Sequence, residues 1–98
     1  MDRSARPLPN PAVVSRQVDA GEAVLVNLDT AASLALNASG FVVWQHVDGK
    51  RTVEEIIAAV QRYYRDVPGT VADDVIALLK ILVEDGFIGF EWAPTTSA

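Results

Sequence analysis

Cysteine is absent from this 98-residue sequence, and histidine occurs once, as His46. The absence of cysteine excludes disulfide bonds, thiolate metal sites, iron–sulfur clusters and cysteine nucleophiles. One histidine without any cysteine cannot build a common zinc site, so we expect neither a metal ion nor another cofactor. A chain without cysteine also fits a reducing compartment, and we expect a cytoplasmic protein.

Basic residues are scarce. Eight Lys and Arg residues stand against 13 Asp and Glu, which gives a formal net charge of -5. Nucleic-acid binding requires a clustered basic face, so we expect no nucleic-acid partner. The longest stretch without a charged residue, Thr30–Val47, contains polar residues and Gly40. Such a stretch is unsuited to crossing a membrane. We therefore expect no membrane association either.

Catalytic arrangements are also missing. Ser39 lacks the G-x-S-x-G context of a nucleophile elbow. The adjacent pairs Asp73-Asp74 and Glu54-Glu55 would point in different directions on a helix, which does not suit a catalytic carboxylate pair. Gly49–Thr52 lacks the preceding glycine of a phosphate-binding loop. We therefore expect that the chain is not an enzyme.

The composition is that of one small globular domain, since half of the residues are hydrophobic and about a fifth are charged. Three prolines among residues 1–12 predict a flexible N-terminal arm. Residues 13–92 are expected to form the domain, and residues 93–98 a disordered tail. No additional domain is evident, so a free-standing protein that acts in trans is expected.

Three short segments rich in β-branched and other apolar residues predict strands, at Val13–Val18, Ala23–Asn27 and Ala32–Leu36. In the second segment Val24, Val26 and Leu28 share one face. The alanines of the third segment are also compatible with a helix. A strand is favoured because the segment is short and because Asn37, which can start a helix, follows it.

Three helices are predicted after these strands. Asn37 can cap a first helix that runs to about His46. Residues 52–55 (TVEE) form a capping box, and an apolar stripe with helical spacing follows it. The third helix begins near residues 70–73 and ends at about Asp85, before Gly86. Residues 87–92 are expected to form a short strand or an apolar segment packed on the domain.

The third helix is more apolar than a surface helix needs to be. Eight apolar residues fill an arc of roughly 160°, where a stripe somewhat wider than 100° would cover a core. Ile81 lies outside this arc, next to Asp74 and Asp85. The helix either is simply the central helix of a small domain, or it also lines a groove along its Asp74–Leu78–Ile81 edge.

The strands provide a second wall for such a groove. A three-stranded sheet does not close into a barrel, so two of its edges remain. An extended peptide can pair with an exposed edge, while neighbouring pockets select its side chains. Alternatively, residues 10–14 or 87–92 of the chain cover that edge.

Three blocks of the sequence, in this order, resemble the PqqD-like family. Leu36–Trp44 (LNASGFVVW) resembles the family stretch LN-x-(S/T)-G-x-x-(I/V)-W. Asp48–Ile56 (DGKRTVEEI) is similar to the turn and helix start DG-x-R-T-V-x-E-I. Asp74–Ile88 is similar to the closing pattern DV-x-x-L-L-x-x-L-x-x-x-G-(F/L)-I. The likeness extends over about residues 8–90.

This resemblance implies an α+β fold, with a three-stranded antiparallel sheet followed by three helices in a winged helix-turn-helix-like arrangement. It implies a recognition element of natural product biosynthesis that is not catalytic and acts as a peptide chaperone. Such elements bind the leader region of a ribosomally synthesised precursor peptide. They present it to a modifying enzyme, such as a radical SAM maturase or a leader peptidase.

The resemblance also places the peptide, which would add as a strand to the third strand and lie against the third helix. The predicted peptide-binding residues are Ala32, Ser33, Leu34, Ala35, Leu36, Asp74, Val75, Leu78 and Ile81. Among them Leu34, Val75, Leu78 and Ile81 are expected to form the apolar wall. Asp74 is expected to be a charged residue at its rim.

Two other functions remain open at this point. A DNA-binding winged-helix regulator has a related architecture but requires a basic recognition helix, whereas this third helix is acidic. A structural or dimerisation module would fill the groove with a second copy of the chain and form a homodimer. Salt-dependent DNA binding would support the first, and light scattering with and without peptide would test the second.

Overall fold

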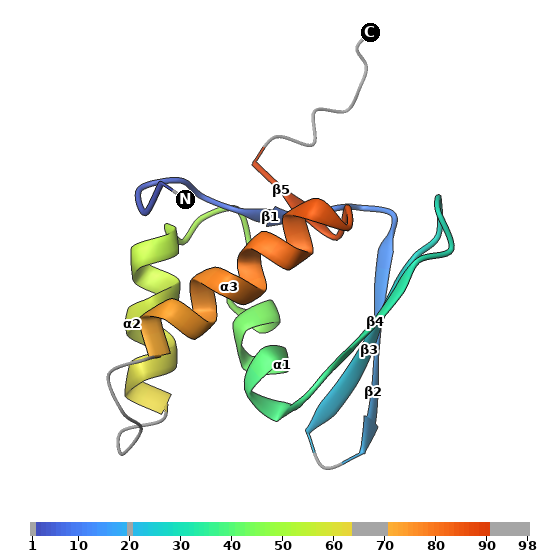
Figure 1. Cartoon of the computed structure of the whole chain (residues 1–98), viewed down its shortest axis with the longest axis horizontal. Helices are drawn as coiled ribbons and strands as arrows, with labels where there is room; N and C mark the ends of the chain where they lie inside the picture. Colours follow the sequence, from blue (N-terminus) through green and yellow to red (C-terminus); the bar gives the residue numbers. More distant parts are fainter. Residues whose placement is uncertain (1, 20, 64–70, 91–98) are drawn as a thin grey trace, which may run out of the picture.

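The computed structural model describes residues 2–19, 21–63 and 71–90. Figure 1 shows the order of the elements, with the helices on one side of the main sheet. They are β1 (Leu8–Pro9), β2 (Val13–Asp19), β3 (Glu22–Asn27), β4 (Ser33–Leu36), α1 (Ala38–Gln45), α2 (Val53–Tyr63), α3 (Val71–Glu84) and β5 (Ile88–Gly89). The predicted α+β fold, a three-stranded antiparallel sheet followed by three helices, is confirmed.

The main sheet has the strand order β2-β3-β4, so β2 and β4 are its two edges. Along β3 the residues facing the helices are buried, namely Ala23, Leu25 and Asn27. Val24 and Val26 do share a face, as predicted, but it is the face turned away from the core. Apolar residues therefore occupy both faces of β3, and the alternation alone did not reveal which face is buried.

The helix boundaries follow the predicted caps. Asn37 accepts a hydrogen bond from the Gly40 amide at 2.8 Å, which caps α1. The Thr52 hydroxyl accepts from the Glu55 amide at 3.1 Å, while the Glu55 carboxylate accepts from the Thr52 amide at 2.8 Å. The latter bond, together with the side chain of Thr52, holds the pKa of Glu55 below its usual value. The capping box of α2 is thus confirmed.

The core forms where β3 and β4 meet the three helices. Leu25 and Leu36 contribute from the sheet, and Val43 contributes from α1. The buried face of α2 carries Val53, Ile56, Ile57 and Val60, and that of α3 carries Val71, Val75, Leu79 and Leu82. The predicted start of the third helix at residue 70 and the predictions for residues 91–98 fall outside the described residues.

The N-terminal segment was expected to be a flexible arm over residues 1–12, whereas the structure attaches residues 3–10 to the domain by hydrogen bonds and strand pairing. Its strand β1 pairs with β5, with Leu8 opposite Gly89 and Pro9 opposite Ile88. The carbonyl oxygens of Arg3 and Ala5 accept hydrogen bonds from the Glu54 amide at 3.0 Å and the Val53 amide at 2.9 Å.

These two amides lie in the first turn of α2, where helix amides have no partner within the helix. The arm therefore supplies the missing acceptors for α2. Proline content predicts an extended segment but does not predict a partner 48 residues further along the chain, as in the contact between Ala5 and Val53.

We expect deletion of residues 1–6 to lower the free energy of unfolding by about 1–2 kcal/mol, because the hydrogen bonds to the first turn of α2 are lost. Urea denaturation followed by circular dichroism measures this change. The control is Arg3→Ala, which removes the exposed ion pair with Glu54 but leaves the Arg3 carbonyl in place. Its expected cost is below about 1 kcal/mol. Equal stability of the deletion variant and the full chain would contradict this role.

Candidate functional site

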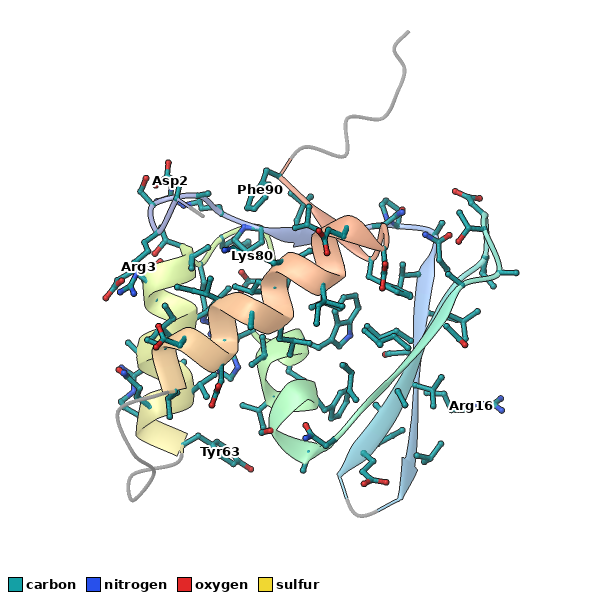
Figure 2. The ribbon with its side chains drawn as sticks, in the orientation of Figure 1. Asp2, Arg3, Arg16, Tyr63, Lys80 and Phe90 are labelled. Carbon is teal, nitrogen blue, oxygen red and sulfur yellow. The ribbon has the colours of Figure 1, made fainter. Side chains whose placement is uncertain are left out.

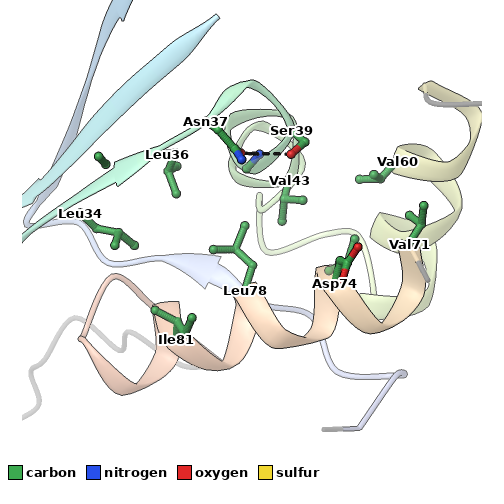
Figure 3. A pocket seen from close by; sticks show the side chains of 13 residues that line it. Leu34, Leu36, Asn37, Ser39, Val43, Val60, Val71, Asp74, Leu78 and Ile81 are labelled. Atoms are coloured by element: carbon green, nitrogen blue, oxygen red, sulfur yellow. Dashed lines mark hydrogen bonds between the residues drawn. The ribbon is translucent and has the colours of Figure 1, made fainter. Parts of the chain in front are cut away.

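A groove of about 730 Å³ lies between β4 and α3. Figure 3 shows α1 at its base, with Leu34 and Ile81 at one end and Asp74, Val71 and Val60 at the other. The residues that line it are Leu34, Ala35, Leu36, Asn37, Ser39, Gly40, Val43, Val60, Val71, Asp74, Val75, Leu78 and Ile81. The surface is therefore mostly apolar, and its polar side chains are Asn37 and Ser39 on the α1 side and Asp74 on α3.

Seven of the nine residues predicted from the sequence line this groove. They are Leu34, Ala35, Leu36, Asp74, Val75, Leu78 and Ile81. Ala32, which precedes β4, and Ser33, which begins it, do not line the groove. Val75 and Leu36 are almost fully buried and belong to the core as well as to the wall. Ile81 is 44% exposed, so it is free to contact something outside the core.

The structure adds residues that the sequence analysis did not select. Asn37, Ser39, Gly40 and Val43 come from α1 and its N-cap, Val60 comes from α2, and Val71 is the first residue of α3. They reach the groove because β4 leads directly into α1 beside the start of α3. Their spacing along the chain carries no signal for this meeting, since only tertiary packing brings α1, α2 and the start of α3 together.

The free edge of β4 can be read from its hydrogen bonds. The Asn27 amide donates to the Ala32 carbonyl oxygen at 2.9 Å, which makes residues 27 and 32 a hydrogen-bonded pair. Hydrogen-bonded and non-hydrogen-bonded pairs alternate along an antiparallel ladder. Leu34 therefore bonds to Leu25 in β3, whereas the peptide groups of Ser33 and Ala35 point outward from the sheet.

The outward-pointing backbone groups of β2, the other edge strand of the sheet, follow from its hydrogen bonds in the same way. The Leu28 amide donates to the Ala12 carbonyl oxygen at 2.9 Å, so the Ser15 peptide group points away from β3. This edge strand contains a register irregularity between Gln17 and Asp19, and none of its described residues lines the groove. Figure 2 shows Arg16 on the side of the sheet away from the helices. Of the two described edges of the main sheet, the β4 edge is the one whose free backbone groups lie beside this apolar groove.

Polar groups gather where β4 meets α1. The Asn37 side-chain oxygen accepts from the Gly40 amide at 2.8 Å and from the Ser39 hydroxyl at 3.0 Å. Asp74 lies across the groove, in the first turn of α3, and is exposed. Within the part of the chain that the structure describes, its carboxylate makes no hydrogen bond or ion pair. This end of the groove therefore offers an unpaired negative charge.

The described residues contain no cluster of three acidic or histidine side chains that could hold a metal ion. Half-buried His46 lies with its Nδ1 at 2.7 Å from the Val42 carbonyl oxygen, at the end of α1. No described helix has the length and apolar character needed to cross a lipid bilayer. The chemistry that the groove supports is binding through backbone pairing and apolar contact.

Comparisons with solved structures give two matches. The structure "TbiB1 in Complex with the TbiA(beta) Leader Peptide" has a TM-score of 0.73 and 28% identity, over 88% of this chain and 99% of that chain. The heterocyclase TruD has a TM-score of 0.61 and 21% identity, over 95% of this chain and 12% of that much longer chain. The second match shows that the fold also occurs as a small part of an enzyme.

A comparison with curated protein sequences gave no match. The sequence profile of a protein family, described as Coenzyme PQQ synthesis protein D (PqqD), matches residues 22–88. The matched region runs from the start of β3 to the start of β5, so it contains both walls of the groove and all three helices. This is more than half of the chain, and the chain therefore belongs to the PqqD family.

Proposed function

We propose that this protein is a non-catalytic adaptor that binds the leader region of a ribosomally synthesised precursor peptide and presents it to a modifying enzyme. The observation that carries the proposal is the unpaired edge of β4 beside the apolar groove on α3. Membership of the PqqD family and the similarity to TbiB1, whose structure contains a leader peptide, support it.

The backbone of the peptide would pair with β4. Ser33 and Ala35 direct their amide and carbonyl groups outward and can form a short ladder with an extended guest. Each hydrogen bond contributes only about 0.5–1.5 kcal/mol net, because water already bonds the free groups. Backbone pairing of this kind gives orientation and some affinity, but it does not distinguish one sequence from another.

Selection among sequences would come from the wall formed by α3. Alternate side chains of the added strand point into the groove, about 6.5–7 Å apart along the strand. At one end they would meet Leu34, Leu78 and Ile81, which favour an apolar side chain. At the other end the unpaired carboxylate of Asp74 favours a lysine or arginine. We therefore expect a leader segment with an apolar anchor and a basic residue beyond it.

Presentation to an enzyme follows from simultaneous binding of both partners. A domain of about 98 residues offers surface beyond the groove, and an adaptor that also binds the enzyme raises the local concentration of the peptide. A radical SAM maturase and a leader peptidase remain the candidate enzymes. The presence of the same fold within a heterocyclase supports an association of this fold with modifying enzymes.

The charge of α3 argues against the DNA-binding alternative. Its exposed charged side chains are Asp73, Asp74 and Glu84 against the single base Lys80. A recognition helix in the major groove approaches phosphates closely, and these carboxylates would repel them. The groove therefore fits a peptide better than it fits nucleic acid.

Strand addition is tested with Ser33→Pro and Ala35→Pro, each of which removes one outward-pointing amide from β4. The probes are the TbiA(beta) leader peptide and a short peptide selected against this protein from a display library of random sequences. We expect each variant to bind the selected peptide at least about tenfold more weakly, which corresponds to about 1.4 kcal/mol. Isothermal titration calorimetry measures the affinity, and circular dichroism verifies folding.

The matched control is Ser15→Pro, which removes an outward-pointing amide from the opposite edge, in β2. It should leave peptide affinity unchanged. Folded Ser33→Pro and Ala35→Pro variants that bind as tightly as the original protein would refute strand addition.

Ile81→Asp tests the apolar wall. Because Ile81 is 44% exposed, the charge should weaken peptide binding while the melting temperature changes little. The control Ala77→Asp introduces the same charge at an exposed position of α3 that does not line the groove. Binding affinity and thermal melting are measured for both. If Ile81→Asp unfolds the domain, or if both variants bind equally well, Ile81 is not part of the binding wall.

Asp74→Asn tests the proposed preference for a basic residue. Peptides that carry a lysine or arginine should bind about two- to fivefold more weakly to the variant, since an exposed ion pair contributes up to about 1 kcal/mol. The difference should vanish at high salt, which screens exposed charges. Asp73→Asn is the control, because Asp73 is exposed on the same turn but does not line the groove. An equal effect of both substitutions would indicate net charge rather than a local contact.

A further inference from the structure

Asn27, the last residue of β3, is a buried polar residue that is only 2% exposed. It faces the same side of the sheet as Leu25, toward the helices. A buried carboxamide must find partners for both its oxygen and its nitrogen, or burial becomes costly. Asn27 finds them in two segments that are far apart in the sequence.

The oxygen of this side chain holds the turn that leads into β4. Asn27 Oδ1 accepts hydrogen bonds from the amides of Asp29 at 2.9 Å and Thr30 at 3.3 Å. The main chain of Asn27 joins the same turn, since its amide donates to the Ala32 carbonyl and its carbonyl accepts from the Ala31 amide. Ala31 has a φ of 65°, a left-handed backbone conformation that is unfavourable for a residue with a Cβ. The bonds made by Asn27 help to maintain this conformation.

The nitrogen of the same side chain holds the end of α3. Asn27 Nδ2 donates to the Gly86 carbonyl oxygen at 3.1 Å. Gly86 has a φ of 80°, and its amide donates to the Val83 carbonyl while the Phe87 amide donates to the Leu82 carbonyl. This Schellman arrangement fixes the Gly86 carbonyl relative to α3. Asn10 Nδ2 donates to that carbonyl as well, at 3.0 Å.

One side chain therefore joins the start of β4 to the end of α3, and these elements are the two walls of the groove. Leu34 and Ile81 lie at one end of the groove, on opposite walls (Figure 3). The groups that Asn27 bonds are close to them along the chain, since Thr30 lies four residues before Leu34 and Gly86 lies five residues after Ile81. We propose that Asn27 is a positioning residue for peptide binding, which fixes the spacing of the walls and thereby the apolar side chain accepted between Leu34 and Ile81. This inference rests on the proposed function.

Two variants of Asn27 separate its two contacts. Asn27→Asp keeps an oxygen for the turn but replaces the donor to Gly86 with an oxygen that repels the carbonyl. Asn27→Ser keeps a hydroxyl acceptor for the turn but is too short to reach Gly86. Two peptides are used as probes. The first is the library-selected peptide, and the second carries alanine in place of the residue that NMR shows in contact with Leu34 and Ile81. The measured quantity is the ratio of the two dissociation constants, which reports selectivity for the anchor.

We expect this ratio to fall at least about threefold in each variant, because a wall that is no longer fixed discriminates less between the two peptides. Partial unfolding lowers the affinity for both peptides equally and cancels in the ratio. The control is Asn10→Ala, which removes the other donor to Gly86 without touching the turn before β4. It should lower the melting temperature and leave the ratio unchanged.

An unchanged ratio in folded Asn27→Asp or Asn27→Ser overturns the positioning role. An equal fall of the ratio in Asn10→Ala also overturns the positioning role of Asn27, since any loosening of α3 would then be enough to lower the selectivity. If neither Asn27 variant folds, the proposal is tested by the hydrogen exchange rate of the Asn27 side-chain amide in the original protein. If the bond from Asn27 to Gly86 strengthens peptide binding, then by thermodynamic linkage peptide binding must also stabilise that bond. The bound peptide should therefore slow the hydrogen exchange of the Asn27 side-chain amide by about threefold or more. Equal exchange with and without peptide overturns the proposal.

The outcomes remain separate from those of the proposed function. Unaltered binding by Ser33→Pro and Ala35→Pro removes the proposed function and this inference together. An unaltered anchor ratio removes only the role of Asn27.

Discussion

The unpaired backbone of an edge strand is the constraint on which this molecule depends. A sheet of three strands must expose two rows of amide and carbonyl groups, and exposed edges invite pairing with other chains. The two edges differ here. A register irregularity interrupts β2 near its end, whereas β4 is a regular segment of four residues beside an apolar groove. The surface of the protein thus leaves one edge suited to an extended guest, and the groove limits which guest can use it.

The second wall of the groove requires α3 to serve two purposes. Val75, Leu79 and Leu82 are buried in the core, while Leu78 and Ile81 on the neighbouring face are only partly covered. A helix that shares its apolar surface in this way gives up some packing within the domain. The N-terminal arm and the bonds at Gly86 add contacts around both ends of the helical layer, at the start of α2 and the end of α3. These contacts help a small domain to keep α3 in place beside the groove.

Local sequence signals predicted the elements well because their causes are local. Asn37 and the Thr52–Glu55 pair specify helix starts through bonds that span three residues, and Gly86 ends α3 through its own backbone conformation. The arc of apolar residues on the third helix also indicated one wall of the groove. Long-range contacts left no such signal. The arm on α2, the approach of Val43 and Val60, and the partner of Asn27, which lies 59 residues away, required the structure. Peptide binding by the nine selected residues stays a prediction.

The partial exposure of the groove has an energetic consequence for its use. Apolar surface left in water at Leu34, Leu78 and Ile81 contributes nothing to folding, but each Å² that a guest covers is worth about 25 cal/mol on binding. Ordering an extended peptide costs part of that gain, since each immobilised residue loses conformational freedom. A short backbone ladder and a few apolar contacts therefore give moderate affinity. Moderate affinity would suit the proposed adaptor role, because a leader that is bound too tightly would not pass on to the next step once its modification is complete.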